Sequence, residues 1–198
     1  MTSPAETRTR LYLVKEQLGP SPRLAIFIDG PYLSKAANSL GLRDNNTDFD
    51  FQKMLKFLAD PEKCRLATAR YYSGLTFSPT AYPFFGKLER LGYEVIASKG
   101  NPVTGKTAPV DHQLLTDLCL LKDTYQIATV VSGDGDFAYA IEGLAGNFGK
   151  RVNIIAARHN ISTSLLELAD KYPQKVRILL LDEHYQWFTM RRVFSKVA

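Results

Sequence analysis

The sequence predicts an α/β fold, a sandwich of helices around a mostly parallel central sheet of about five to six strands. Two observations predict it. Short apolar runs rich in β-branched and aromatic residues alternate along the chain with longer segments of helical spacing. The strand-like runs are almost continuously apolar, which is typical of parallel strands that helices cover on both faces. With 45% hydrophobic residues in a length of 198, the chain can bury one core of ordinary size.

The predicted elements follow one another in a β-α-β order. The strands, beginning with "RLAIFID", are expected over residues 23–29, 66–73, 93–98, 127–132, 151–157 and 176–181. Helices are expected, from the spacing of apolar residues, over residues 51–59, 81–92, 111–125, 137–149 and 162–172. We expect one domain, an N-terminal extension before it and a basic, aromatic tail after it, over residues 23–182, 1–22 and 183–198 respectively.

Composition excludes several classes of protein. Two isolated cysteines, Cys64 and Cys119, have neither the spacing of a zinc site nor the density of a disulfide framework, which favours a reducing compartment. No stretch approaches the roughly 18 apolar residues of a membrane span, and the first residues lack the apolar centre of a signal peptide. These features predict a soluble, cytoplasmic protein. The net charge of +5 is compatible with an anionic partner.

Carboxylates follow the predicted strands at the points where these end. Asp29 ends the first strand, Asp134 and Asp136 follow the fourth, and Asp111 opens a helix after the loop that leaves the third. Right-handed crossovers gather the carboxyl ends of parallel strands along one edge, where open α/β sheets have their sites. We therefore expect these four acids to converge. A single Asp after a strand is more often a turn former or a helix N-cap, so the convergence carries the argument.

Converging carboxylates favour a bound cation. Two of them about 4 Å apart repel by roughly 4 kcal/mol at an effective dielectric near 20. Hard oxygen ligands without a Cys or His set suit Mg²⁺ or Mn²⁺ better than zinc. An ion held by Asp29, Asp111, Asp134 and Asp136 is able to activate water against a phosphodiester. Gly135 allows a sharp turn between the last two.

Other residues near this edge are candidates for supporting or binding roles. Asp117 lies about 600° around an ideal helix from Asp111, so a surface position and a supporting role are both open. Lys99, Lys106 and Arg158 are candidates for binding the phosphates of a nucleic acid, with a solvated loop as the alternative. Tyr71, Tyr72 and Phe77 flank the end of the second strand, where core packing is favoured over stacking on a base.

The tail after the domain combines aromatic and basic residues. The spacing of Trp187, Met190, Arg191 and Phe194 predicts one helical face. We expect this face to dock on the domain, because free apolar faces of that size are uncommon in soluble monomers. The alternatives are contact with a second copy of the chain, with another protein partner, or with RNA.

Three segments together resemble a known family. "LAIFIDGPYL", the helix opening "VDHQLLTDLCLL" and "TVVSGDGDFAYAIEGLAGNFGKRVNII" resemble the NYN domain, the LabA-like branch of the PIN-like nuclease superfamily, and the resemblance covers residues 23–182. It implies a PIN-like α/β/α sandwich and metal-dependent ribonuclease activity. By motif match, the acidic positions are Asp29, Asp111, Asp134 and Asp136, Ser132 supports them, and Asp117 matches a recurrent acid.

One position departs from the family pattern. The family usually has D-G-x-N after the first strand, whereas this chain has "DGPY", so that Tyr32 stands in place of the Asn. Two functions therefore remain. The first is hydrolysis of single-stranded RNA through a carboxylate-bound Mg²⁺ or Mn²⁺. The second is a catalytically weak NYN protein that binds RNA or a protein partner as a regulator. A Toprim-like or haloacid phosphatase-like site is disfavoured by the order of the motifs.

Overall fold

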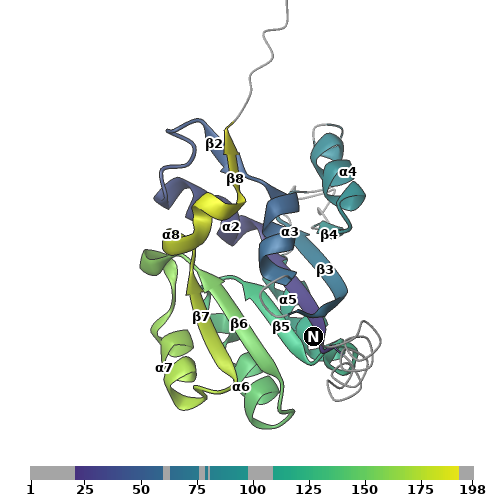
Figure 1. The fold of residues 1–198 in the computed structure, drawn as a ribbon, viewed down its shortest axis with the longest axis vertical. Helices are drawn as coiled ribbons and strands as arrows, with labels where there is room; N and C mark the ends of the chain where they lie inside the picture. Colours follow the sequence, from purple (N-terminus) through teal and green to yellow (C-terminus); the bar gives the residue numbers. More distant parts are fainter. Residues whose placement is uncertain (1–20, 60–62, 76–78, 80, 98–108, 192–198) are drawn as a thin grey trace, which may run out of the picture.

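Six parallel strands form the centre of the molecule (Figure 1). The structure is a computed structural model that describes residues 21–59, 63–75, 79, 81–97 and 109–191. The sheet has the order β4-β3-β1-β5-β6-β7. Its strands are β1 (Arg23–Asp29), β3 (Arg65–Ser73), β4 (Glu94–Ala97), β5 (Ile127–Val131), β6 (Arg151–Ala156) and β7 (Val176–Leu180). The predicted fold class is confirmed.

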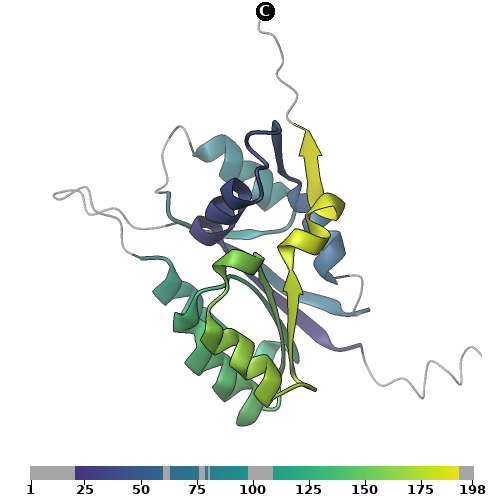
Figure 2. The ribbon, with the colours of Figure 1, turned by 90° about the vertical axis from the view of Figure 1, so that its left-hand side faces the viewer.

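Helices cover both faces of this sheet. The predicted ones are found as α3 (Phe51–Ala59), α4 (Tyr82–Arg90), α5 (Asp111–Leu120), α6 (Ala138–Gly146) and α7 (Thr163–Lys171). The last three lie side by side on one face, and α3 lies on the opposite face (Figures 1 and 2). Strand β5 is buried along its whole length between these layers, which explains its continuous apolar sequence.

A helix that the sequence analysis did not predict begins directly after β1. This helix, α2 (Gly30–Ser39), contains Gly, Pro, Ser and Asn, which are poor helix formers. It is started by Asp29, whose carboxylate accepts a hydrogen bond of 3.0 Å from the Tyr32 backbone N–H, and by Pro31 in its first turn. Leu33, Ala36 and Ala37 are on its buried face. The cap and this face outweigh the low propensity.

The described part of the tail is not the predicted helix. After β7 the chain forms a short helix, α8 (Leu181–His184), a 3₁₀ turn, η4 (Tyr185–Phe188), and a strand, β8 (Thr189–Arg191). Strand β8 pairs antiparallel with β2 (Thr47–Phe49). Phe188 is 1% exposed and Trp187 64% exposed, so the neighbouring aromatic residues face opposite ways. The expected helical face is wrong because Met190 and Arg191 are held extended by pairing with β2; Phe194 lies outside the described residues.

The strand order places a crevice at a defined position. From β1 the chain builds the sheet outwards through β3 and β4, and then returns to build β5, β6 and β7 on the other side of β1. The order therefore reverses between β1 and β5, and open α/β sheets bind ligands at the carboxyl ends of the strands at such a point. No helix within the described ranges is long and apolar enough to cross a lipid bilayer.

Candidate functional site

Asp29 ends β1 at the reversal point, and the residue is 7% exposed. One oxygen accepts from the Tyr32 backbone N–H at 3.0 Å, and the other accepts from the Ser132 hydroxyl at 3.0 Å. Burial raises the pKa of this carboxyl above its ordinary value, and the negative charges of Asp134 and Asp111 raise it further, against the lowering effect of the two hydrogen bonds. Two hydrogen bonds thus fix the Asp29 carboxylate, while burial and the neighbouring negative charges disfavour its ionised form.

Ser132 and Asp134 shape the turn that follows β5. Ser132 is 1% exposed, and its hydroxyl accepts a bond of 3.3 Å from the Asp134 backbone N–H while it donates to Asp29. The exposed Asp134 carboxylate caps a short 3₁₀ helix, η2 (Gly135–Phe137), through a bond of 3.0 Å from the Asp136 N–H. The serine therefore connects the ends of β1 and β5, and its supporting role in a site stays a prediction.

Three of the expected acids line one cavity of about 420 Å³. Asp29 comes from β1, Asp134 from the turn after β5, and Asp111 from the first turn of α5. Lys35, an exposed residue of α2, lines the same cavity. Lys35 was not among the expected site residues, because the helix that carries it, α2, was not expected. An Asp followed by Gly-Pro and then by apolar residues three and four apart is a helix-start signal that would have revealed it.

The structure places two other acids outside this cavity. The Asp136 carboxylate is exposed and lines a different depression, together with Tyr139 of α6. Asp117 accepts hydrogen bonds from the guanidinium of Arg70 at 2.7 Å and from the hydroxyl of Tyr72 at 2.8 Å. Asp117 thus joins α5 to β3, away from Asp111, and a role for it in the site stays a prediction. The role of Asp136 as a ligand stays a prediction.

Arg158, the one predicted basic residue that the structure describes, does not line the acidic cavity. The Arg158 guanidinium pairs with Glu183 at 2.6 Å, and its backbone N–H donates to Asp182 at 2.7 Å. Lys99 and Lys106 lie outside the described residues, as does Phe77. Phosphate binding by these three cations stays a prediction, and Lys35 is the cation that the structure adds.

Tyr32 connects α2 to the segment after β6. Its hydroxyl accepts a bond of 2.9 Å from the Ala157 N–H and donates one of 3.0 Å to the Asn160 carbonyl. Burial, offset in part by the bond from Ala157, raises the pKa of Tyr32 to about 12, so the phenol stays neutral at physiological pH. The residue that departs from the family pattern therefore uses its hydroxyl to join α2 to the segment after β6, and it also lines the cavity.

Gly133 makes this joint possible. A Cβ atom at this position would lie 2.1 Å from the Asn160 carbonyl oxygen and 2.6 Å from the Tyr32 hydroxyl. Both contacts are far shorter than any tolerated by a side chain. The glycine after Ser132 is thus required by the close approach of its turn to Tyr32 and to Asn160.

The donor chemistry of the cavity fits Mg²⁺ or Mn²⁺, because all three acids offer hard carboxylate oxygens and the raised pKa of Asp29 reflects unbalanced negative charge. The spacing fits an ion held directly by all three less well. Among the described residues, no group of three or more His, Cys, Asp or Glu side chains is arranged to hold a metal ion. Mg²⁺ keeps several waters and is commonly bound through one or two carboxylates, and this mode is compatible with the cavity.

Comparisons with known proteins agree with this geometry. The sequence profile of the NYN domain matches residues 23–175. The chain is 29% identical over 159 residues to the low amplitude and bright protein LabA of Synechococcus elongatus, a match that covers 76% of this chain and 82% of LabA. The fold is similar to that of VPA0982, a Vibrio parahaemolyticus protein of unknown function, with a TM-score of 0.65, 18% identity, and coverage of 87% of this chain and 98% of that one. The profile spans most of the chain, including Asp29, Asp111 and Asp134, and the protein therefore belongs to the NYN domain family of the PIN-like nuclease superfamily.

Proposed function

We propose that this protein is a metal-dependent ribonuclease that hydrolyses phosphodiester bonds of single-stranded RNA. The observation that carries the proposal is the shared cavity of Asp29, Asp111 and Asp134 at the reversal point of the sheet. Membership of the NYN family supports RNA as the substrate class. A cluster of acids with a raised pKa for its buried member is the arrangement expected where a cation and a phosphate meet.

Each residue has a defined part in this proposal. Asp29 and Asp134 are the proposed ligands of Mg²⁺ or Mn²⁺, and Asp111 and Asp136 act through water. The bound ion would polarise the phosphate and lower the pKa of a water molecule. Ser132 holds the Asp29 carboxylate in one orientation through its bond of 3.0 Å, so that the ligand is positioned before the ion arrives.

Lys35 supplies the positive charge that an entering phosphate requires. Its side chain is exposed on α2 and lines the cavity beside Pro31 and Asp29. Phosphate contacts from Lys position a strand and strengthen binding without reading its sequence. We assign Lys35 to binding the phosphate that is cleaved or its neighbour, in addition to the predicted Lys99, Lys106 and Arg158.

The arrangement around Tyr32 favours a second candidate function, a catalytically weak NYN protein that binds RNA or a protein as a regulator. The Tyr32 hydroxyl is engaged with Ala157 and Asn160, so it does not replace the amide that the family pattern directs towards the metal or the phosphate. The retained set of acids favours the enzyme, and an assay that measures binding and cleavage together separates the two.

The test uses labelled single-stranded RNA with Mg²⁺, with Mn²⁺ and with EDTA. The wild-type protein is compared with Asp134→Asn and with Asp170→Asn, in which an exposed Asp in the last turn of α7 is changed in the same way. The enzyme proposal expects cleavage that needs the metal, is lost in Asp134→Asn and is retained in Asp170→Asn. Retention of RNA without products supports the regulator. If the wild-type protein neither cleaves nor retains the RNA, both proposals lose RNA as the ligand.

A further inference from the structure

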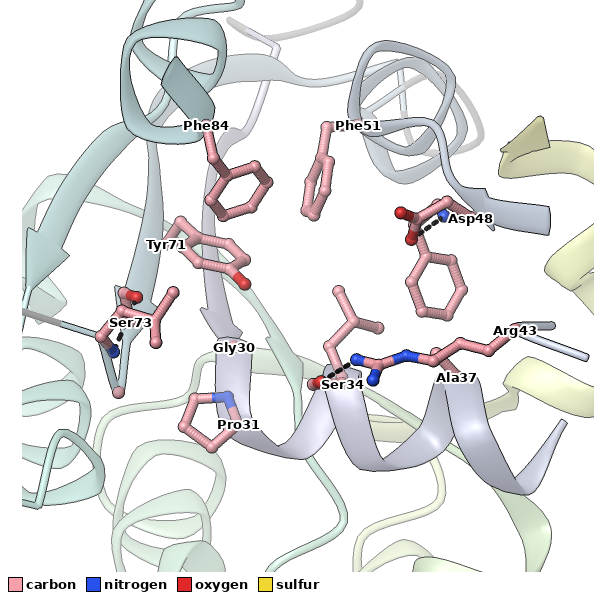
Figure 3. Close-up of a pocket in the computed structure, with 14 residues that line it drawn as sticks. Gly30, Pro31, Ser34, Ala37, Arg43, Asp48, Phe51, Tyr71, Ser73 and Phe84 are labelled. Carbon is pink, nitrogen blue, oxygen red and sulfur yellow. Dashed lines mark hydrogen bonds between the residues drawn. The ribbon is translucent and has the colours of Figure 1, made fainter. Parts of the chain in front are cut away.

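The structure has a second cavity, of about 540 Å³, which is drawn in Figure 3. Pro31 and Gly74 line both cavities. The two are therefore neighbours at the carboxyl ends of β1 and β3, with the first turn of α2 between them. A polymer strand with one phosphate at the acids would carry its adjacent nucleotide into this second cavity.

Three aromatic rings form one wall of the second cavity. Phe51, Tyr71 and Phe84 pack pairwise edge to face, with ring centroids 5.5, 5.7 and 5.6 Å apart and interplanar angles of 84°, 64° and 81°. This arrangement fixes the rings against one another. Figure 3 shows the Tyr71 hydroxyl pointing into the cavity. Burial raises the pKa of Tyr71, which keeps this hydroxyl a hydrogen-bond donor.

The rest of the lining carries polar groups among the apolar residues Leu33, Ala37 and Phe49. The exposed Arg43 guanidinium extends along α2 and donates to the Ser34 hydroxyl at 2.7 Å (Figure 3). Asp48 of β2 accepts from the Phe49 N–H at 2.9 Å through one carboxylate oxygen. A planar donor and an anionic acceptor thus face the aromatic wall, which is the combination that reads the edge of a flat, polar ring.

This cavity is open to solvent rather than a defect of the core. Arg43, Ser34 and Leu75 at its rim are exposed, Leu75 by 58%. Apolar and aromatic walls with a few convergent polar groups are typical of pockets that bind small planar ligands. The described packing accounts for Phe51 and Tyr71 as core residues, but it does not account for an open space of this size between them and Arg43.

We propose that the second cavity binds an unpaired nucleobase of the RNA strand next to the phosphate at the acidic cavity. The placement of the strand rests on the proposed function. Aromatic side chains stack on bases without need of a particular sequence, and the polar edge of the base then meets Arg43, Asp48 and the Tyr71 hydroxyl. A base within a duplex cannot present its face and edge in this way, which makes the protein selective for single strands.

The test measures binding of labelled RNA hexanucleotides by fluorescence anisotropy in Ca²⁺, with a gel to show that the strand stays intact. Each sequence is compared with a hexamer in which one nucleotide at a time is abasic. The wild-type protein is expected to lose about tenfold in affinity when one particular base is missing, in line with the energy of one base stacked on an aromatic ring. Phe84→Leu, which keeps apolar volume without a π face, and Arg43→Gln are expected to bind the intact strand about as weakly as the wild type binds that abasic one.

The control is Arg65→Gln, which removes the same charge from an exposed position at the start of β3, at the other end of the strand. It is expected to leave the abasic penalty unchanged. The proposal is overturned if wild-type protein binds no RNA, if no single abasic position matters, or if the penalty persists in Phe84→Leu and Arg43→Gln. If the variants lose affinity for RNA but the wild type does not cleave it, the base-binding cavity is supported and the nuclease proposal is contradicted. If the wild type cleaves RNA but the variants bind it as tightly as the wild type, the nuclease proposal is supported and the base-binding cavity is contradicted.

Discussion

At the scale of single residues, the surroundings of Asp29 disfavour the ionised form of its carboxyl group. Its pKa is raised above 3.8, first by burial, so the folded chain holds this proton more tightly than the unfolded chain. The free energy of unfolding therefore falls as the pH rises from 3.8 through the higher folded pKa. Asp29→Asn removes the charge and keeps an oxygen that accepts from the Tyr32 N–H. We expect this variant to be more stable than the wild type at pH 7, while it loses cleavage.

Urea titrations at several pH values measure this difference, which should close below pH 3.8, where both side chains are neutral. Asp44→Asn, a change at an exposed turn residue, serves as the control and should alter stability little at any pH. Equal or lower stability of Asp29→Asn at pH 7 would show that the two hydrogen bonds outweigh the cost of burying the charge.

Tyr32 gives a second prediction at this scale. Tyr32→Phe leaves the N–H of Ala157, a residue 2% exposed, without its acceptor. We expect the free energy of unfolding to fall by about 1–3 kcal/mol, the cost of an unsatisfied buried donor. Tyr139→Phe is the matched control, because Tyr139 is 89% exposed and should change stability by less than about 0.5 kcal/mol. Equal values for the two variants in urea denaturation would contradict the role given to the Tyr32 hydroxyl.

Part of this site was predictable from the sequence because the ends of apolar runs indicate where strands end. Asp29 is the last residue of one apolar run and Asp134 comes three residues after another, and a parallel sheet brings such positions together. Asp136 is only two residues further on, in the 3₁₀ turn η2, yet it lines a different depression from Asp134. A change of direction within one turn depends on local hydrogen bonds, here from the Asp136 N–H to the Asp134 carboxylate, that no spacing rule resolves.

At the scale of elements, Asp117 attaches α5 to the sheet. Its carboxylate accepts from Arg70 and Tyr72, and Arg70 also pairs with Glu94 at 2.9 Å. Asp117→Asn is expected to lower the free energy of unfolding by about 1–3 kcal/mol, since it breaks a largely buried ion pair that is still partly screened by water. Asp123→Asn, in a pair whose Asp is 82% exposed, should cost less than about 0.5 kcal/mol.

The same variant separates a structural from a catalytic role for Asp117. If this acid only positions α5, the cleavage rate per folded molecule should stay within about threefold of the wild type, a change of less than about 1 kcal/mol in the barrier. If Asp117→Asn loses activity without losing stability, Asp117 has a role in the active site.

Phe188 makes the corresponding prediction for the tail. Its ring packs on Phe57 at 5.2 Å and on Phe49 at 6.1 Å between ring centroids. Phe188→Ala should lower the free energy of unfolding by about 3–5 kcal/mol through the cavity that it leaves. Trp187→Ala, at the exposed neighbour, should cost less than about 0.5 kcal/mol, as measured by urea or thermal denaturation. A reversed order would mean that the helical face expected from the sequence is the true packing surface.

Helices and strands were predictable where apolar residues keep the same spacing along the whole element. The buried strands and α3 meet this condition, and the boundaries of α3 agree with those expected. Helix α2 depends on a cap and on tertiary packing, and both override its low propensity. Strands β2 and β8 have three residues each and are defined only by pairing with each other across the chain, so a local pattern contains almost no information about them.

At the scale of the whole molecule, the acidic cavity couples metal binding to stability. An ion that binds only the folded chain stabilises it by about 2.7 kcal/mol at 100 times its dissociation constant. For a chain of this size, that free energy raises the melting temperature by roughly 5–10 °C. We expect Mn²⁺ to produce this shift in the wild type, EDTA to reverse it, and Asp29→Asn to lack it. An equal shift in Asp29→Asn would place the ion elsewhere.

The global fold was the most predictable level because many weak signals agree on it. Continuous apolar strands, intervening helices and crossovers of one hand leave few topologies open. The order of the strands was not fixed by these signals, and it is the reversal between β1 and β5 that brings Asp29 and Asp134 together. Which strands become neighbours depends on packing between helices far apart in the chain, beyond the reach of local pattern.

The pairing of β2 with β8 has a mechanical consequence. Residues 47–49 are paired in register with residues 189–191, and two of them, Asp48 and Phe49, line the second cavity. Whatever is attached after Arg191 is thereby tethered to that wall. A protease that trims the chain back to Phe188 would leave β2 as an unpaired edge, and a fusion partner added at the carboxyl terminus would exert its force on the same strand. An affinity tag for this protein therefore belongs at the other terminus.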